Sequence, residues 1–162
     1  MAAADDPRDS RRAVEAWESL FRAQVAVLRR LGADDIWQDV SFREYDVLFT
    51  LRSRPGHAAR LRDLAALSLL SQPSLSRMVD RLVTRGLVAR QAVPGDARGT
   101  FVVLTEEGVR VQGEVGRRHA EAIAAYVGGA LDDAELDALR DLTSRLREAQ
   151  DAIPDVTRHR AR

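Results

Sequence analysis

Residues 71–86 constrain the fold most, because they read as one capped helix with two chemically different faces. Ser71 can cap the start, Pro73 is tolerated in the first turn, and Gly86 suits the left-handed position after the last turn. Apolar residues recur at spacings of three and four, on one stripe that must be buried against other helices. These residues are Leu75, Met78, Val79 and Leu82.

The opposite face of this helix is polar and basic. It carries Gln72, Ser74, Ser76, Arg77 and Arg81. An α-helix fits the major groove of DNA, where base edges present distinct donor and acceptor patterns to such side chains. We therefore interpret residues 71–86 as a DNA-reading helix.

The charge distribution agrees with this interpretation, although the formal net charge of the chain is zero. Residues 60–99 contain seven arginines and three acids, whereas residues 132–151 contain seven acids and three arginines. Positive charge is thus concentrated around the DNA-reading helix. All 25 basic residues are arginines, so a phosphate or guanine contact would be made by a planar, bidentate guanidinium group.

Composition excludes several other classes of protein. The chain has 162 residues and no cysteine, which rules out disulfides and thiolate metal sites. Three dispersed histidines form no recognisable metal set, and no cofactor motif, nucleophile elbow or phosphate loop is present. No apolar run reaches the roughly 18 residues of a membrane span, and the N-terminus does not resemble a signal peptide. We expect a cytoplasmic protein that is not an enzyme.

Helical periodicity continues on both sides of residues 71–86. It predicts long helices at about residues 10–32, 105–128 and 132–153, a helix from Ser41 with a capping-box Glu44, and a short helix at about residues 62–67. Residues 1–9 and 155–162 are predicted to be tails. The winged helix-turn-helix lobe is expected at about residues 41–104, within a single domain of residues 10–154.

A β-hairpin is predicted immediately after the DNA-reading helix. Residues 87–93 and 100–104 are prone to form strands, and residues 94–99 between them contain Pro, Gly and Asp, which favour a turn. Arg98 would lie at the exposed tip. The expected fold is therefore mostly α (α+β): a winged helix-turn-helix with a two-stranded wing and N- and C-terminal dimerisation helices.

The terminal helices carry more apolar surface than one small winged domain can cover. The last helix alone repeats Leu136, Leu139, Leu142, Leu146, Ala149 and Ile153. We expect these helices to pack against the same helices of a second copy. The alternative is that they close the core of a monomer.

Residues 61–108 resemble the MarR (multiple antibiotic resistance regulator) family of winged-helix transcription factors. The motifs that carry the resemblance are Leu-Arg-Asp-Leu-Ala at 61–65, Ser-Leu-Ser-Arg-Met-Val-Asp-Arg-Leu at 74–82, Arg-Gly-Leu-Val at 85–88, Asp-Ala-Arg at 96–98 and Leu-Thr-Glu-Glu-Gly at 104–108. The resemblance implies a homodimer that binds a pseudo-palindromic operator in double-stranded DNA. Members usually repress, and commonly release DNA when a small molecule binds.

The resemblance and the chemistry of the side chains together assign candidate DNA contacts. Gln72, Ser74, Ser76 and Arg77 lie on the first two turns, and Arg77 is the first candidate for a bidentate contact, unless it pairs with Asp80. Arg81 is as well suited to a structural ion pair as to a phosphate. Arg62 and Arg90 are either phosphate contacts or solvated charges.

Two residues of the hairpin have separate roles. Arg98 resembles the wing arginine of the family, which enters the minor groove, where narrow A·T-rich segments attract arginine. Asp96 would repel phosphate, so we interpret it as a brace of the wing.

A ligand cleft is the least determined feature. The resemblance places it near the first two helices, where Trp17, Phe21, Trp37, Tyr45 and Asp46 are candidates for binding a small aromatic or phenolic effector. Aromatic residues at helical spacing are also typical of a core. The favoured function is a sequence-specific DNA-binding transcriptional repressor released by an effector, and the alternative is a winged-helix protein-interaction module without operator binding.

Overall fold

The computed structural model describes residues 7–66, 71–93 and 96–155, and the side chains of residues 10–65, 71–92 and 99–155. The connection between the predicted helices at 62–67 and 71–86, and most of the two predicted tails, lie outside these residues. The chain divides into two compact units, Met1–Ala122 and Ile123–Arg162. Within the described residues, no helix is long and apolar enough to span a membrane.

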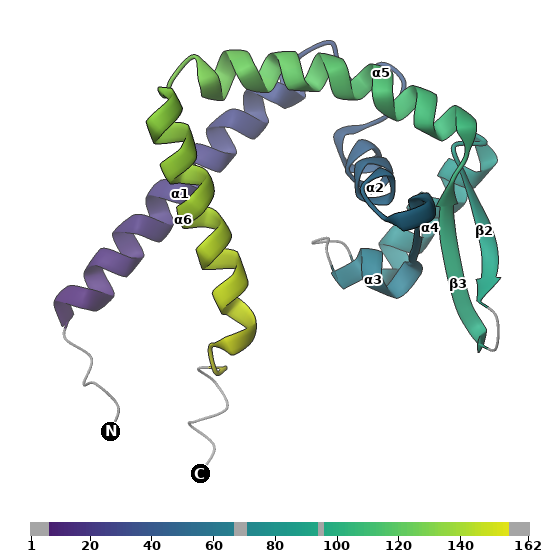
Figure 1. Cartoon of the computed structure of the whole chain (residues 1–162), viewed down its shortest axis with the longest axis horizontal. Coiled ribbons are helices and arrows are strands. Elements are labelled where there is room, and N and C mark those ends of the chain that lie inside the picture. The colour runs from purple at the N-terminus through teal and green to yellow at the C-terminus, as the bar shows by residue number, and fades with distance from the viewer. Residues whose placement is uncertain (1–6, 67–70, 94–95, 156–162) are drawn as a thin grey trace. The chain divides into compact units, whose positions relative to one another are not determined.

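The first unit holds the helices and strands expected for a winged helix (Figure 1). In chain order they are α1 (Pro7–Ala33), α2 (Phe42–Arg52), a 3-10 turn (Pro55–His57), β1 (Ala58–Arg60), α3 (Leu61–Ala66), α4 (Gln72–Thr84), β2 (Val88–Val93), β3 (Asp96–Leu104) and α5 (Glu106–Ile123). Helix α1 begins at Pro7, three residues before the predicted start at residue 10. The prediction missed residues 7–9 because their sequence does not extend the apolar stripe from which the helix was predicted.

The sheet has three antiparallel strands in the order β1-β3-β2. Sequence analysis predicted β2 and β3 but not β1, whose three residues pair with residues 101–103 of β3. The prediction of the hairpin tip was wrong in length. Strand β3 begins at Asp96, paired with Val93, so Asp96 and Arg98 belong to the strand and not to a six-residue loop.

The core of the first unit forms where α2, α4, the sheet and the start of α5 meet. Its fully buried side chains include Leu48, Leu51, Leu75, Val79, Leu82, Val88, Val102 and Val115. The apolar stripe of α4 is therefore buried as its periodicity predicted. This burial turns the polar face of α4 toward solvent.

Local signals at the helix ends were mostly confirmed. Ser41 and Glu44 form a capping box at the start of α2, and Gly86 has a φ of 70° after α4. The proposed cap at Ser71 was wrong in one respect. Ser71 occupies the N-cap position, but its hydroxyl makes no capping bond to the backbone and instead donates to Ser74 Oγ at 2.9 Å.

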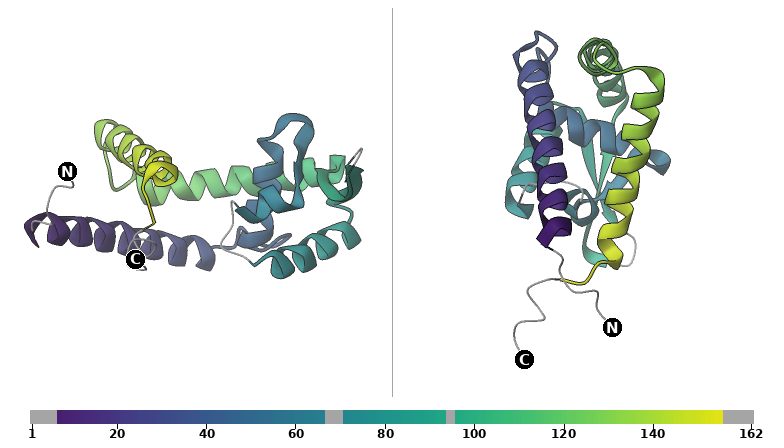
Figure 2. Two further views of the ribbon diagram at one scale, coloured as in Figure 1. Left: turned by 90° about the horizontal axis from the view of Figure 1, so that it is seen from below. Right: turned by 90° about the vertical axis from the view of Figure 1, so that its left-hand side faces the viewer.

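The second unit contains a π-helical turn (Ala124–Gly128) and α6 (Asp133–Ala149). A capping box between Asp132 and Glu135 starts α6, close to the predicted start of the last helix at about residue 132. None of the residues of α6 is buried. Figure 2 shows α6 as one regular helix, and its side chains Leu139, Leu142 and Leu146 are exposed.

Candidate nucleic-acid interface

The exposed side of α4 presents a connected set of polar groups over its first two turns. Gln72 and Arg77 are exposed, and Ser74 is half-buried between them. Ser71 Oγ donates to Ser74 Oγ, and Arg77 Nη2 lies 3.5 Å from the same oxygen. Ser71 therefore joins the predicted contact residues. The sequence could have indicated this role of Ser71, because residues three apart at the start of a helix lie on the same face.

Arg77 has no ion-pair partner among the described residues. The nearby carboxylate of Asp80 pairs with Arg90 instead. The predicted alternative, an Arg77–Asp80 pair, is thus not formed. A guanidinium group with five donors and no carboxylate beside it remains able to make a bidentate contact. Of the arginines on α4, Arg77 is the one that the geometry leaves available.

Arg90 joins the hairpin to α4. Its Nη2 donates to Asp80 Oδ1 at 2.8 Å and lies 3.2 Å from Ser76 Oγ and 3.3 Å from the Ser76 carbonyl oxygen. Two predicted contact residues, Ser76 and Arg90, are therefore bonded to each other. The bonds hold β2 against the middle of α4.

The last turn of α4 is tied to the start of α2. Arg85 Nη1 lies 3.5 Å from Glu44 Oε2, Arg81 Nε lies 3.9 Å from Glu44 Oε1, and Arg85 also donates to the Asp39 carbonyl oxygen. Glu44 is mostly buried, with 13% of its side chain exposed. Of the two roles open to Arg81, this geometry favours the structural one.

The remaining candidates for DNA contact lie on α3 and on the sheet. Arg62 on α3 is exposed and lies 3.4 Å from Asp63, a weak pair at this degree of exposure. The side chains of Asp96 and Arg98 lie outside the described residues. Arg60 on β1, which the sequence did not single out, stacks over the ring of Phe101 with its guanidinium carbon 5.7 Å from the ring centroid.

A second cluster, of aromatic rings, joins α2, α5 and the segment before α2. The Trp37 ring lies 5.2 Å from Phe42, 5.7 Å from Tyr45 and 5.1 Å from His119. We call Trp37, Phe42, Tyr45 and His119 the aromatic cluster. Burial lowers the pKa of His119, and its Nε2 is buried without a hydrogen-bond partner.

The interior edge of the aromatic cluster is polar. Burial raises the pKa of Tyr45, against the effect of a side-chain hydrogen bond with Gln112, and the charge of Asp46 raises it further. Gln112 is 8% exposed, and Gly116 leaves room for the phenol, because a Cβ at that glycine would lie 3.1 Å from the Tyr45 hydroxyl. Neither Gln112 nor Gly116 stood out in the sequence, since only the packing of α5 on α2 brings them to Tyr45.

Two of the five predicted ligand residues lie apart from the aromatic cluster. Trp17 and Phe21 on α1 stack on each other with centroids 6.2 Å apart, and both are exposed. No ring contact in the described part of the chain joins them to Trp37 or Tyr45. As for metals, no cluster of three or more potential ligands occurs among the described residues.

Comparison with known proteins gives concordant matches. Residues 38–99 match a sequence model of the MarR family. The transcriptional regulator PecS of Dickeya dadantii is 31% identical over 104 residues, which are 64% of this chain and 63% of PecS. The match therefore spans less than two thirds of that relative.

Solved structures extend the similarity to more of the chain. The MarR family regulator Sco3205 of Streptomyces coelicolor, determined in complex with DNA, superposes with a TM-score of 0.72 and 26% identity over 83% of this chain and 84% of Sco3205. AbsC from the same organism gives a TM-score of 0.74 at 23% identity, over 94% of this chain and 100% of AbsC, and supports the fold alone. The named relatives are transcriptional regulators and not enzymes.

Proposed function

We propose that the chain is a member of the MarR family and acts as a sequence-specific DNA-binding transcriptional regulator. The observation that carries the proposal is the exposed start of α4. There Gln72, Ser74 and Arg77 face solvent while the apolar stripe of the same helix is buried. Sco3205, a relative with this fold, has been crystallised with DNA.

In the proposed complex, the first two turns of α4 enter the major groove. Arg77 makes the bidentate base or phosphate contact, and Gln72, Ser71 and Ser74 donate or accept beside it. Ser76 and Arg90 hold β2 and α4 together, and the donors that Arg90 has left face the phosphates. Arg62 adds a contact to the DNA backbone, which positions the protein without reading sequence. Arg81 instead supports the end of α4 through Glu44.

The hairpin is proposed to act as the wing. Arg98, on the first residues of β3, enters the minor groove, and Asp96 braces the hairpin beside it. The support for this is the position of both residues next to the β2–β3 connection. The resemblance of residues 96–98 to the family motif supports the same assignment.

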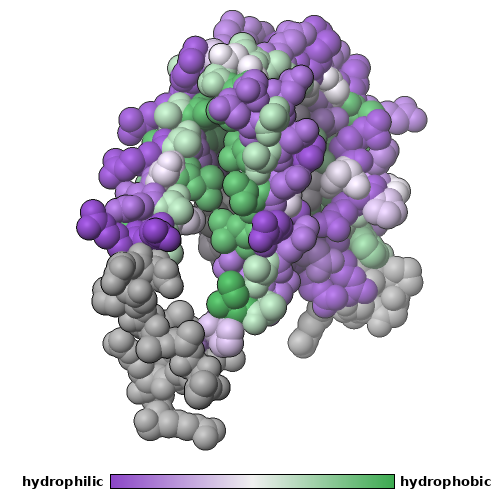
Figure 3. Space-filling view, turned by 60° about the vertical axis from the view of Figure 1, so that its left-hand side comes forward, coloured by the Kyte–Doolittle hydropathy of each residue, from purple (hydrophilic) through white to green (hydrophobic). Residues whose placement is uncertain are grey.

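A homodimer would present two such lobes to a pseudo-palindromic operator, with half-sites about one helical turn apart. The described structure supports dimerisation through its uncovered apolar stripes. On α1 the exposed residues are Val14, Trp17, Phe21 and Leu28, and on α6 they are Leu139, Leu142 and Leu146. Figure 3 shows hydrophobic side chains at the surface among hydrophilic ones.

We further propose that the protein represses transcription and releases DNA when a small molecule binds near α2. The aromatic cluster is connected to α4 through one short segment. Trp37 belongs to the cluster, and Asp39, two residues later, accepts bonds from Arg85 of α4 and, at 3.3 Å, from Arg118 of α5. A ligand that displaces Trp37 would thus act directly on the segment that holds the end of α4.

The DNA proposal is tested by fluorescence anisotropy with a labelled duplex from the promoter region of the gene itself. We expect tight binding that weakens steeply with salt, because phosphate contacts release counterions. Arg77→Ala should reduce the affinity roughly 5- to 150-fold, since a bidentate base contact contributes on the order of 1–3 kcal/mol.

A double variant and a control complete this experiment. Arg77→Ala combined with Arg98→Ala should abolish discrimination between the promoter and a scrambled duplex. Arg117→Ala removes an exposed arginine from α5, outside the proposed interface, and should leave the affinity unchanged. Full affinity in the double variant would contradict the proposed interface.

A further inference from the structure

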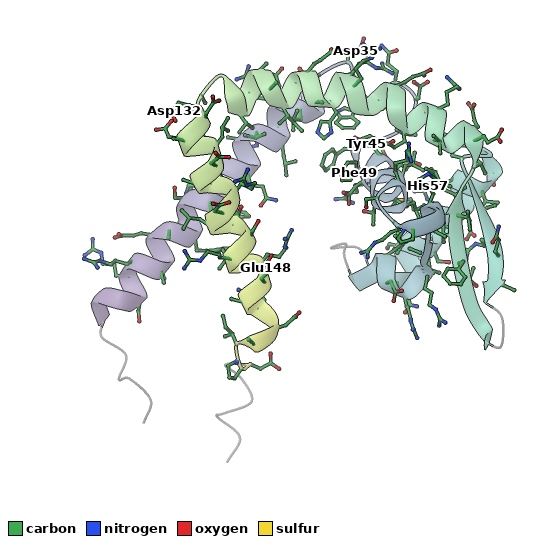
Figure 4. The ribbon with its side chains drawn as sticks, in the orientation of Figure 1. Asp35, Tyr45, Phe49, His57, Asp132 and Glu148 are labelled. Atoms are coloured by element: carbon green, nitrogen blue, oxygen red, sulfur yellow. The ribbon has the colours of Figure 1, made fainter. Side chains whose placement is uncertain are left out.

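One face of α2 carries an exposed carboxylate between two exposed aromatic rings. Phe42, Asp46 and Phe49 follow one another at spacings of four and three, so they lie on one side of the helix. Phe42 is 36% exposed and Phe49 is 52% exposed. Tyr45 and Phe49 both project from α2 in Figure 4, with centroids 6.1 Å apart, so this face continues into the aromatic cluster.

Asp46 differs from the other acids of the winged lobe. In the described part of the chain it has no hydrogen bond and no ion pair, whereas Asp39, Glu44 and Asp80 each accept from an arginine. Burial of its carboxylate raises the pKa of Asp46, and no neighbouring cation lowers it. The carboxylate is therefore accessible to a ligand and able to pair with a positive group.

The groups around Asp46 leave its negative charge uncompensated. Burial lowers the pKa of His119 and raises that of Tyr45, so both are neutral near pH 7. Arg118, the residue before His119, is engaged by Asp39. The face formed by Phe42, Asp46 and Phe49, together with the aromatic cluster, thus combines ring surfaces with one carboxylate that has no partner among the described residues.

We propose that this face of α2 binds a small aromatic cation, whose ring packs on Phe42 and Phe49 and whose ammonium group pairs with Asp46. Charge complementarity selects the occupant. The rings attract a cation electrostatically through their faces, and the carboxylate adds a direct ion pair. An aromatic carboxylate would meet like charge at the same position and should bind more weakly.

This inference deepens the proposed release by a small molecule and rests on that function for its regulatory meaning. The binding itself is independent of DNA. It can therefore be tested on the full-length protein alone, and DNA binding can be measured separately on the same samples.

The experiment compares three naphthalenes that differ mainly in charge: 1-naphthylmethylamine, which is a cation at pH 7, neutral 1-naphthylmethanol and anionic 1-naphthoate. Binding is measured by isothermal titration calorimetry. In a Trp17→Phe background it is also followed by quenching of the single remaining tryptophan, Trp37, which lies 5.2 Å from Phe42. We expect the cation to bind about tenfold more tightly than the alcohol, and the carboxylate more weakly than both.

Asp46→Asn tests the origin of the preference. The variant should lose most of the preference for the cation over the alcohol, while its affinity for the alcohol stays as in the parent protein. Glu121→Gln removes the same charge from an exposed position on α5 and should preserve the preference. Asp46→Asn should also bind promoter DNA normally, because Asp46 lies outside the proposed DNA interface.

Each remaining result counts against the inference. Equal affinity for the three compounds, tightest binding of the carboxylate, or an unchanged preference in Asp46→Asn would overturn it. The inference would also be overturned if none of the three compounds bound and Asp46→Asn weakened the dimer. That result would show that a second copy of the chain covers this face. Failure of the wild-type protein to bind DNA would contradict the proposed function but not the preference for a cation.

Discussion

Gly108 shows how strongly one residue of this fold can be constrained. It lies in the first turn of α5, where Thr105 Oγ1 accepts from its N–H at 3.0 Å. A Cβ at this position would lie 2.0 Å from the Leu87 carbonyl oxygen and 2.9 Å from a methyl group of Leu104. That carbonyl also accepts from the Thr105 N–H at 3.1 Å, so it cannot retreat without losing a bond. Glycine is required here for close packing, and not for an unusual φ.

We therefore predict opposite effects for two glycine-to-alanine changes in α5. Gly108→Ala should lower the free energy of unfolding by about 1–3 kcal/mol through overpacking. Gly113→Ala, where nothing lies within 4 Å of the added Cβ, should raise it by up to about 1 kcal/mol. Urea denaturation measures both, and equal effects would contradict the packing argument.

At the scale of elements, the segment between α1 and α2 connects more of the first unit than its length suggests. Trp37 Nε1 donates to the Leu31 carbonyl oxygen at 2.5 Å, which folds the segment back on the end of α1. Asp39 is bonded to α4 and α5, and Ser41 and Glu44 start α2. The start of α2 and the end of α4 are thus fixed by the same few residues.

The capping box is the part of this segment most easily tested. Ser41→Ala removes the hydroxyl that accepts from the Glu44 N–H at 3.3 Å and should cost about 1 kcal/mol of stability. Glu44→Ala should cost more, since it also leaves Arg85 without its carboxylate. Thermal or urea unfolding ranks the two variants, and the reverse order would show that the ties to α4 contribute little.

At the scale of the whole molecule, exposed apolar stripes on α1 and α6 are the dominant unexplained surface of a single chain. Leu142 is 61% exposed and Trp17 is 59% exposed, although both lie on regular amphipathic stripes. Large contiguous apolar patches on a soluble protein mark sites of association. A second copy of the chain is the partner that the family resemblance favours.

We predict a dimer at micromolar concentration that a charge on the stripe of α6 disrupts. Leu142→Glu should shift the mass measured by light scattering from two chains toward one and weaken operator binding. Ser144→Glu places the same charge away from the stripe and should leave the dimer intact. A wild-type mass of one chain would contradict the prediction.

Local chemistry in the sequence was enough to place most elements of the first unit. The three-and-four periodicity predicted α4 and its buried stripe, and the spacing of Ser41 and Glu44 predicted the start of α2. Gly86 marked the end of α4 by its freedom to adopt a positive φ. These features depend on residues within a few positions of one another, which is why sequence alone determined them.

Only the tertiary structure decided which polar groups are engaged. Strand β1 is three residues long and is stabilised by its pairing with β3, so no local sequence pattern predicted it. Arg90 bonds to Asp80 and Ser76 from another element, and Asp46 stays unpaired beside rings that α5 helps to assemble. Charge pairing and ring packing depend on distances between residues remote in the chain. The sequence thus determined the helices and their faces, whereas the packing of α5, α4 and the sheet decided which of those faces remained free to bind.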